Sequence, residues 1–195
     1  MKIYRPENII NRYVWEQFKT QAPSFYNLYP PTVGADDFIP FFPAGTGNIP
    51  PEIIENDLPY IVFDKFTKVR TGKYKYFYPV KSEQMRYTIY GGSLYGNAAN
   101  GSDRYGVTIN LTSLISAILD REDAAAEDIN TFSRTLTDYT DANYNELFRY
   151  RFHCINVFQS GYAETQQDVS NLMEYKPSRD LIIKYDYHSK QYNES

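Results

Sequence analysis

The residues that could support nucleophilic or acid–base catalysis are few in this chain. There are two histidines, His153 and His188, and one cysteine, Cys154. His153 and Cys154 are neighbours in a segment that alternates like a β-strand, so their side chains should point to opposite faces and cannot form a Cys–His pair. A free cysteine usually behaves as a small buried hydrophobe, and no G-x-S-x-G motif offers a serine nucleophile. We therefore interpret these residues as structural and predict that the protein is not an enzyme.

A glycine-rich segment at 91–106 precedes the strongest helical pattern, where a phosphate-binding loop would be expected. Its letters GGSLYG and the later Gly101-Ser102 lack the Gly-Lys-Ser/Thr ending of a P-loop and do not match G-x-G-x-x-G. We interpret the segment as a flexible connection between a strand and a helix, and we predict no cofactor.

An acidic cluster follows the same helical pattern. Carboxylates can bind calcium or magnesium, but this spacing does not match a calcium loop and no glycine makes the required turn. We predict no metal site and instead expect a solvated helix face or a charged rim that meets a partner. The acidic residues and their interleaved arginine are Asp120, Arg121, Glu122, Asp123, Glu127 and Asp128.

The segment 73–81 interleaves lysines with aromatic residues, a pattern that can form a stacking platform for single-stranded nucleic acid. Tyr74, Tyr76 and Tyr78 also share one face of a β-strand, which explains the same spacing without a ligand. The formal net charge of −4 argues against a dedicated nucleic-acid-binding protein. The strand interpretation is therefore preferred.

Composition limits the remaining classes of protein. A chain of 195 residues fits one domain, 1–195, and one cysteine excludes an intrachain disulfide framework. No apolar stretch is long enough to cross a membrane, and the first residues lack the apolar run of a secretory signal. Tyrosine outnumbers leucine, 20 to 10, which favours protein interfaces because a tyrosine combines a large apolar ring with a polar tip.

Hydrophobic periodicity predicts an α/β (α+β) fold with a central mixed, mainly antiparallel sheet flanked by helices. A helix is expected over 7–19, ending before Pro23. A second helical pattern starts at Leu111, with Asn110 or Thr112 as its cap, and continues to Leu136 as one helix or as two helices with a break near Asp123. Strands are expected over 60–63, 73–80, 85–90, 147–158 and 181–188, with a weaker helix over 166–175. Pro79 should mark an edge strand or a bulge.

The segment 20–57 shows no clear period and is rich in proline, glycine and aromatic residues. Because disordered segments usually lack aromatic residues, we predict an ordered, extended arm or hairpin, or a long loop, inserted after the first helix. Its aromatic side chains would be covered by another chain. The expected anchors are Tyr26, Tyr29, Phe38, Phe41 and Phe42, and the acidic cluster supplies the second candidate interface, at Asp120, Arg121, Asp123, Glu127 and Asp128.

Four stretches carry a resemblance to a known family. They are 57–63 (DLPYIVF), 79–91 (PVKSEQMRYTIYG), 120–130 (DREDAAAEDIN) after its helix, and the paired strands 148–158 and 180–188. Together with the order of elements, they resemble the tail terminator proteins, and more closely the tail completion and sheath stabiliser proteins, of contractile-tailed, T4-like bacteriophages. The resemblance covers roughly 58–188 and does not extend to the arm.

This resemblance implies a structural virion protein of the phage neck, assembled in the host cytoplasm. It implies a homohexameric ring that caps the tail tube and sheath and offers a docking face to the head-side connector. The partners would be other copies of the chain, the tube protein, the sheath protein and the connector protein. Genomic DNA would pass through the lumen without specific binding, and no membrane would be involved.

Three alternatives remain open at this point. A head-completion or connector protein of the same neck is the closest, although such proteins tend to be helical or barrel-like. An aromatic binding module for sugar or peptide would show an exposed, concave aromatic row in the monomer. An enzyme would show a pocket that gathers His153 or His188 with several carboxylates.

Overall fold

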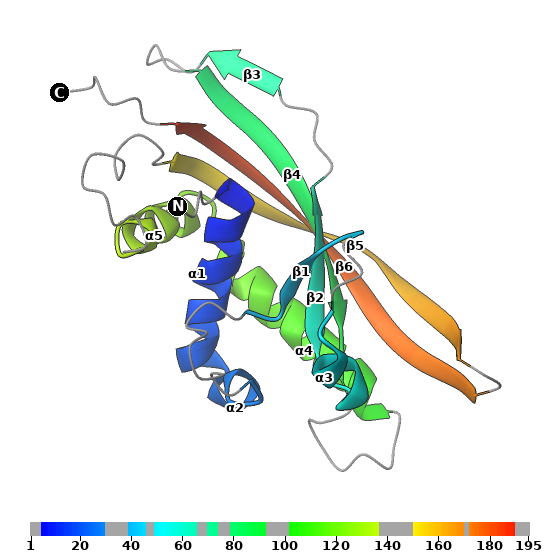
Figure 1. The fold of residues 1–195 in the computed structure, drawn as a ribbon. Helices are drawn as coiled ribbons and strands as arrows, with labels where there is room; N and C mark the ends of the chain where they lie inside the picture. The colour runs from blue at the N-terminus through cyan, green and yellow to red at the C-terminus, as the bar shows by residue number, and fades with distance from the viewer. Residues whose placement is uncertain are drawn as a thin grey trace.

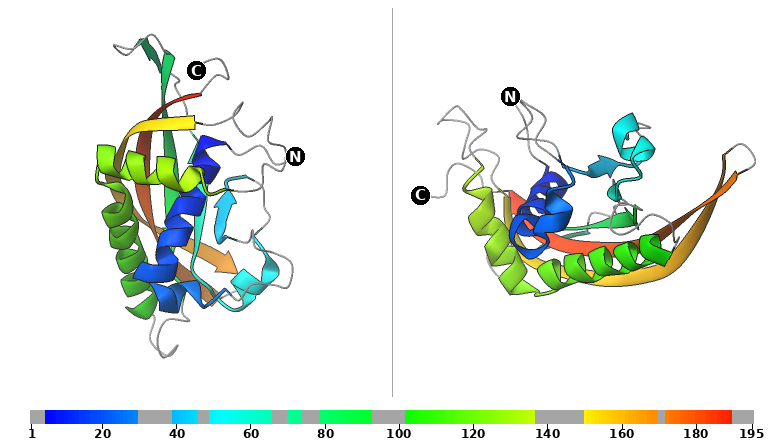
Figure 2. Two further views of the ribbon diagram at one scale, coloured as in Figure 1. Left: turned by 90° about the vertical axis from the view of Figure 1, so that its left-hand side faces the viewer. Right: turned by 90° about the horizontal axis from the view of Figure 1, so that it is seen from below.

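The structure, a computed structural model, describes residues 5–29, 39–45, 49–65, 70–73, 79–92, 102–136, 150–169 and 172–189. A curved sheet lies against helices on one of its faces (Figures 1 and 2). The elements in chain order are α1 (Pro6–Gln21), α2 (Pro23–Tyr26), β1 (Phe41–Pro43), α3 (Pro51–Glu55), β2 (Tyr60–Lys65), β3 (Arg70–Lys73), β4 (Pro79–Tyr90), α4 (Ser102–Leu119), α5 (Asp123–Ser133), β5 (Tyr150–Val169) and β6 (Leu172–Ser189).

The sheet has six strands in the order β1-β2-β4-β6-β5, and β3 also pairs with β4. Among the described strands, β1 and β2 run parallel, and the other pairs are antiparallel. The predicted α/β class with a mixed, mainly antiparallel sheet and flanking helices is therefore confirmed. The strands expected at 60–63, 85–90 and 181–188 lie within β2, β4 and β6.

The two strongest helical patterns are also confirmed. Helix α1 ends at Gln21, before Pro23, and buries its apolar stripe of Ile9, Ile10, Tyr13, Val14 and Phe18. The second pattern forms two helices, α4 and α5, separated at Asp120–Glu122, where Glu122 adopts a positive φ of 50°. The chain therefore turns between them, near the position where a break was expected.

The start of α4 differs from the prediction. The helix begins at Ser102, so Asn110 and Thr112 lie inside it and do not cap it. The hydroxyl of Thr112 instead donates a hydrogen bond to the Thr108 carbonyl, one turn earlier, with an O···O distance of 2.6 Å. The end of the glycine-rich segment, including Gly106, is therefore helical, because packing of α4 on the sheet outweighs the low helix propensity of one glycine.

The beginning of the glycine-rich segment has a packing role. Gly92 follows β4 and lies against the turn before β2, where an added Cβ would overlap the carbonyl oxygen of Asp57. No larger residue fits there unless the backbone moves. This explains one glycine of the motif without a phosphate ligand.

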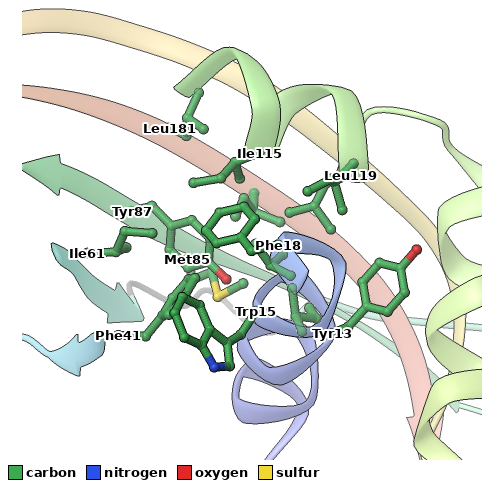
Figure 3. Close-up of a cluster of buried hydrophobic side chains, with 14 of the residues drawn as sticks. Tyr13, Trp15, Phe18, Phe41, Ile61, Met85, Tyr87, Ile115, Leu119 and Leu181 are labelled. Carbon is green, nitrogen blue, oxygen red and sulfur yellow. The ribbon is translucent and has the colours of Figure 1, made fainter. Parts of the chain in front are cut away.

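The core lies between α1, α4 and the sheet, and aromatic rings fill much of it (Figure 3). Trp15 makes an edge contact with Phe18, at 5.9 Å between ring centroids, and Phe41 makes one with Tyr87, at 5.6 Å. The Tyr87 hydroxyl donates a hydrogen bond to Asn11 Oδ1 inside the core. Buried tyrosines thus occupy core positions while their hydroxyl groups keep polar partners.

The prediction of an extended 20–57 arm with no cover from its own chain is wrong. The described parts of this segment form α2, β1 and α3, and β1 joins the sheet beside β2. Its aromatic residues lack helical or strand periodicity because they approach the core from short elements, not from one long one. Phe25, Tyr29, Phe41 and Phe42 all belong to the core of their own chain.

Two further predicted elements, a helix and a strand, need correction. The weak helix expected over 166–175 is instead part of a β-hairpin, in which Gln166 pairs with Tyr175 and Val169 with Leu172. Antiparallel pairing over two long strands outweighs a helical pattern that rests on three apolar residues. The strand expected over 73–80 is divided between β3 and β4, and residues 74–78 lie outside the described part. Pro79 is the first residue of β4, paired with Lys73 of β3.

The two faces of the sheet have different environments. Helices α1, α4 and α5 all lie on one face, which we call the covered face (Figure 2). Its central residues, including Met85, Tyr87, Leu181 and Ile183, have no exposed surface. None of the described helices lies on the opposite, uncovered face. Ser178 and His188 at the two ends of this face are buried. Most residues that point to it are exposed or half-buried, and they include Gln84, Arg86, Thr88, Asn156, Phe158, Ile182 and Lys184.

Candidate functional site

The aromatic anchors predicted in segment 20–57 are mostly inside the molecule. Tyr29, Phe41 and Phe42 are only 6%, 5% and 9% exposed. Burial strongly raises the pKa of the Tyr29 phenol, which donates a hydrogen bond to the Pro59 carbonyl. Their expected exposure is therefore wrong, and in this structure they do not offer a contact surface to a partner. They stabilise the monomer instead.

Tyr26 and Phe38 have different outcomes. Tyr26 is half-buried and lies against Trp15, with 4.7 Å between the ring centroids. The Lys19 ammonium is 5.5 Å from the centre of the Tyr26 ring. Tyr26 therefore remains partly accessible at the end of the helical layer. Phe38 lies outside the described residues.

The acidic candidate residues do lie at the surface. Asp120 and Arg121 form the turn between α4 and α5, and Asp123, Glu127 and Asp128 lie on α5, all of them exposed. We refer to residues 120–128 as the acidic turn. Its location agrees with a solvated or partner-facing surface, whereas Tyr29, Phe41 and Phe42 lie in the core.

One ion pair organises the acidic turn. Arg121 Nη2 lies 2.7 Å from Asp128 Oδ2 and donates a second hydrogen bond to the Tyr13 hydroxyl at 3.1 Å. Burial, and then the Asp128 charge, raise the pKa of Tyr13. These contacts join α1 to the α4–α5 turn, so Arg121 has a positioning role and is not available as a free cation.

Two shallow grooves flank α5. One, of about 440 Å³, lies between α1, α4 and α5 and has the Arg121–Asp128 pair at its wall. The other, of about 290 Å³, lies between α5 and the start of β5, with Arg134 and Arg151 among its lining residues. Neither of these two grooves is lined by His153 or His188.

A buried charged cluster lies on the covered face. Glu83 Oε2 is 2.7 Å from Lys65 Nζ and accepts a hydrogen bond from the Tyr185 hydroxyl at 3.1 Å. Glu7 of α1 is 4% exposed, and its Oε2 lies 3.6 Å from the same ammonium group. Burial, and then the Glu83 charge, strongly raise the pKa values of Tyr185 and Tyr187. This cluster connects α1 to β2, β4 and β6 through two buried carboxylates and the ammonium group of Lys65, which is an exposed residue.

The two histidines come together on neighbouring strands. His153 Nε2 lies 2.6 Å from His188 Nδ1, and their rings are nearly parallel at 25°. The regular alternation used to separate His153 from Cys154 is interrupted, because the β5–β6 register shifts between Phe152 and Cys154. His153 contacts His188, whereas Cys154 accepts a hydrogen bond from the Asn156 side chain. Sequence reasoning missed this pair because the two histidines are 35 positions apart.

A side chain also closes part of the sheet edge. Strand β5 is an outer strand, and the Asn130 amide of α5 donates to the Phe152 carbonyl at 2.9 Å and accepts from the Phe152 N–H at 2.8 Å. The amide therefore makes the two hydrogen bonds that a neighbouring strand would make at this position. Sequence analysis did not single out Asn130.

Comparison with known proteins adds no identification. No protein-family model matches the chain, and no curated protein sequence matches it. Among the described residues, no three His, Cys, Asp or Glu side chains are grouped so that they could hold a metal ion. No described helix has both the length and the apolar character required to cross a bilayer.

Proposed function

We propose that this protein is a structural component of the neck of a contractile-tailed phage. In this proposal it forms a ring that caps the tail tube and sheath and gives the head connector a docking face. The observation that carries the proposal is a sheet whose covered face completes a core while its other face and its longest hairpin extend toward solvent. This architecture suits a subunit that binds other subunits.

The β5–β6 hairpin supports a role in assembly. Pairing between β4 and β6 ends at Tyr90 and Ser178, but pairing between β5 and β6 continues to Val169 and Leu172. Among the described residues, this outer part of the hairpin forms a two-stranded ribbon, which extends away from the helical layer in Figures 1 and 2. Isolated two-stranded ribbons are only marginally stable in water. Contact with another chain would stabilise the ribbon.

The uncovered face supports the same role. Phe158 of β5 is 53% exposed on this face. Its cross-strand partner is Ile182 of β6, and Ile182 in turn pairs with Arg86 of β4. Exposed aromatic and arginine side chains are typical of protein interfaces. The face also contains polar pairs, such as Thr88 and Asp180, whose side chains form a hydrogen bond of 2.8 Å. Polar pairs of this kind suit a surface that is hydrated until the subunits assemble.

The acidic turn would lie elsewhere on the ring. It belongs to the helical layer, on the opposite side of the sheet from the uncovered face. If the hairpin and uncovered face contact neighbours, the turn remains available for the lumen or for a rim. A negative lumen would repel DNA and allow it to slide without binding.

Subunits in a ring must contact each other through two different surfaces related by a rotation that closes. The hairpin ribbon supplies one surface, and a second surface on the neighbouring copy receives it. The hexamer, the tube and sheath contacts, and location in the virion follow from the family resemblance alone.

The proposal can be tested with the intact chain and one shortened variant. We expect size-exclusion chromatography with light scattering, and negative-stain images, to show rings, alone or with tube and sheath proteins. The variant joins Ala163 to Ser178 through Asn-Gly, a two-residue turn that maintains the antiparallel register. It should keep a cooperative thermal unfolding transition and lose ring formation. A wild-type chain that stays monomeric and binds neither tube nor sheath would contradict the proposal.

The structure bears on the alternatives in different ways. A mixed sheet with helices favours a terminator over a head-completion or connector protein, which tends to be helical or barrel-like. An aromatic binding module would show a concave exposed row of rings, but Tyr29, Phe41 and Phe42 are buried in the monomer. An enzyme of the expected kind would gather His153 or His188 with carboxylates in a pocket, and neither of the two grooves beside α5 does so.

A further inference from the structure

The contact between His153 and His188 has no part in the proposed function. The two rings join β5 to β6 beside the register shift at Phe152 and Cys154. His188 is 7% exposed and His153 is half-buried. A shift in register leaves part of the strand ladder disrupted, so a side-chain contact at this point has a larger share in holding the strands together.

The chemistry of this contact depends on protons. A hydrogen bond between two imidazole nitrogens requires one ring to donate and the other to accept, so at least one ring must be neutral. When both rings are protonated, neither nitrogen can accept, and two positive charges stand 2.6 Å apart at the contacting atoms. The contact therefore exists with zero or one added proton, but not with two.

The neighbouring charges include both signs. Arg151, on β5, disfavours a proton on His153, whereas Asp186, on β6, favours one. Asp186 Oδ1 is buried and has no hydrogen-bond partner among the described residues. On the α5 side, Glu122 and Asp123 lie near enough to act on the neighbouring Cys154 thiol, whose pKa is raised mainly by burial. One proton on the pair is thus tolerated, because Asp186 is close to it.

We propose that His153 and His188 form a proton-sensitive clasp that holds the beginning of β5 on β6 and opens when both rings are protonated. Opening would free β5 between Tyr150 and Val157 from β6 and weaken the Asn130 contacts to Phe152. It would leave the pairing of β4 with β6, and the core between them and the helices, in place.

The direction of the pH effect follows from the pKa of His153 in the folded chain. Burial, and then Arg151, lower the pKa of His153 below its ordinary value of 6.5. A histidine with a lowered folded pKa stabilises the closed form fully above its ordinary pKa, and this stabilisation is lost as the pH falls below that value. The clasp should therefore be closed at pH 7.5 and weakened at pH 5.

Hydrogen exchange of the full chain, in the presence of a metal chelator, tests the clasp. Protection factors corrected for intrinsic rates should fall between pH 7.5 and pH 5 for amides of Tyr150–Val157. The largest possible fall in the protection factor is about thirty-fold, which is the value for one imidazole that gains its proton only in the open state. Amides of β4 should change much less. In His153→Gln, where the amide can still form a hydrogen bond but cannot titrate, the β5 change should disappear.

Imidazole titration by nitrogen-15 NMR gives a second readout that does not require a variant to fold. The wild-type rings should titrate in two coupled steps, the lower of them below 6.5. Two independent titrations near 6.5, or an equal loss of β5 protection in wild type and His153→Gln, would overturn the proposal. If His153→Gln fails to fold by circular dichroism, His188→Gln is used in the same comparison.

Discussion

The covered and uncovered faces of the sheet use the same strands but contribute differently to the molecule. Ile183 and Ile182 are adjacent on β6, yet Ile183 has no exposed surface and Ile182 is half-buried on the opposite face. The covered face completes a core within one chain. The uncovered face keeps a mixture of apolar and charged side chains. One side of the sheet therefore stabilises the monomer, and the other side is the surface that the proposed function would use for contacts with partners.

The tyrosines divide in the same way. Tyr87 and Tyr185 are fully buried on the covered face, and burial is the main cause of their raised pKa values. Tyr60 and Tyr90 stack on the other side, at 4.7 Å between centroids, and are half-buried. The high tyrosine content therefore serves the core as well as the surface, and it is not a sign of interfaces alone.

The largest expected difference between the faces comes from truncating the two adjacent isoleucines. Ile183→Ala should lower the free energy of unfolding by about 3–4 kcal/mol, because it leaves a cavity in the core. Ile182→Ala, its matched control, should cost less than about 1 kcal/mol. Urea denaturation followed by circular dichroism measures both. Equal losses in the two variants would show that the uncovered face is packed within the monomer.

A smaller effect is expected where α5 meets the edge of the sheet. Asn130→Ala removes both hydrogen bonds to the Phe152 backbone, so it should cost about 2 kcal/mol. Thr131→Ala, an exposed neighbour on the same helix, should stay within about 0.5 kcal/mol of wild type. Thermal unfolding compares the two variants. A cost for Asn130→Ala no larger than that of its control would show that water replaces the amide.

Removal of one hydroxyl from the covered face should have a still smaller effect. Tyr185→Phe removes a hydrogen bond to Glu83 but leaves the ion pair between Glu83 and Lys65, so about 1 kcal/mol should be lost. Tyr90→Phe, on the uncovered face, should cost less than about 0.5 kcal/mol. Urea denaturation measures the free energy of unfolding of both variants. A larger loss in Tyr90→Phe than in Tyr185→Phe would show that the uncovered face contributes more to stability than the covered face.

The smallest expected effect is on phenol ionisation at the Tyr60–Tyr90 stack. Burial, and then the Tyr90 and Asp57 charges, raise the pKa of Tyr60 to about 12. Because this value exceeds the ordinary value of 10.0, Tyr60 stabilises the fold fully below pH 10 and loses that contribution as the pH rises toward 12. In Tyr90→Phe the pKa of Tyr60 should fall by less than about one unit. Ultraviolet difference titration against Tyr60→Phe measures it, and an unchanged value would exclude coupling within the stack.

Much of the fold could be predicted from local periodicity. The apolar stripe of Ile10, Val14 and Phe18 predicts α1, and alternation through Met85, Tyr87 and Ile89 predicts the buried face of β4. Residues 20–57 could not be assigned in this way. Phe41 and Phe42 enter the core from a strand of three residues, which is too short to show a period. Their burial depends on α1 and β4, which are distant in sequence.

The site was less predictable than the fold. The exposed position of Asp123 and Asp128 follows from their charge, but the pairing of Arg121 with Tyr13 depends on how α1 packs against the α4–α5 turn. His153 and His188 meet only because the β5–β6 register shifts by one residue at Phe152. Strand register is determined by the whole hairpin, so a local pattern cannot reveal the contact.

The amide of Asn130 has a consequence for strand addition at the β5 edge of the sheet. A long outer strand such as β5 is a template on which identical chains can add indefinitely. At Phe152 the Asn130 side chain already forms hydrogen bonds with the backbone N–H and C=O groups that an incoming strand would need. Pairing along this edge is therefore blocked at Phe152, beside α5, and an added strand would have to pair with the part of β5 beyond it. The same amide that stabilises one molecule restricts where the next one can attach.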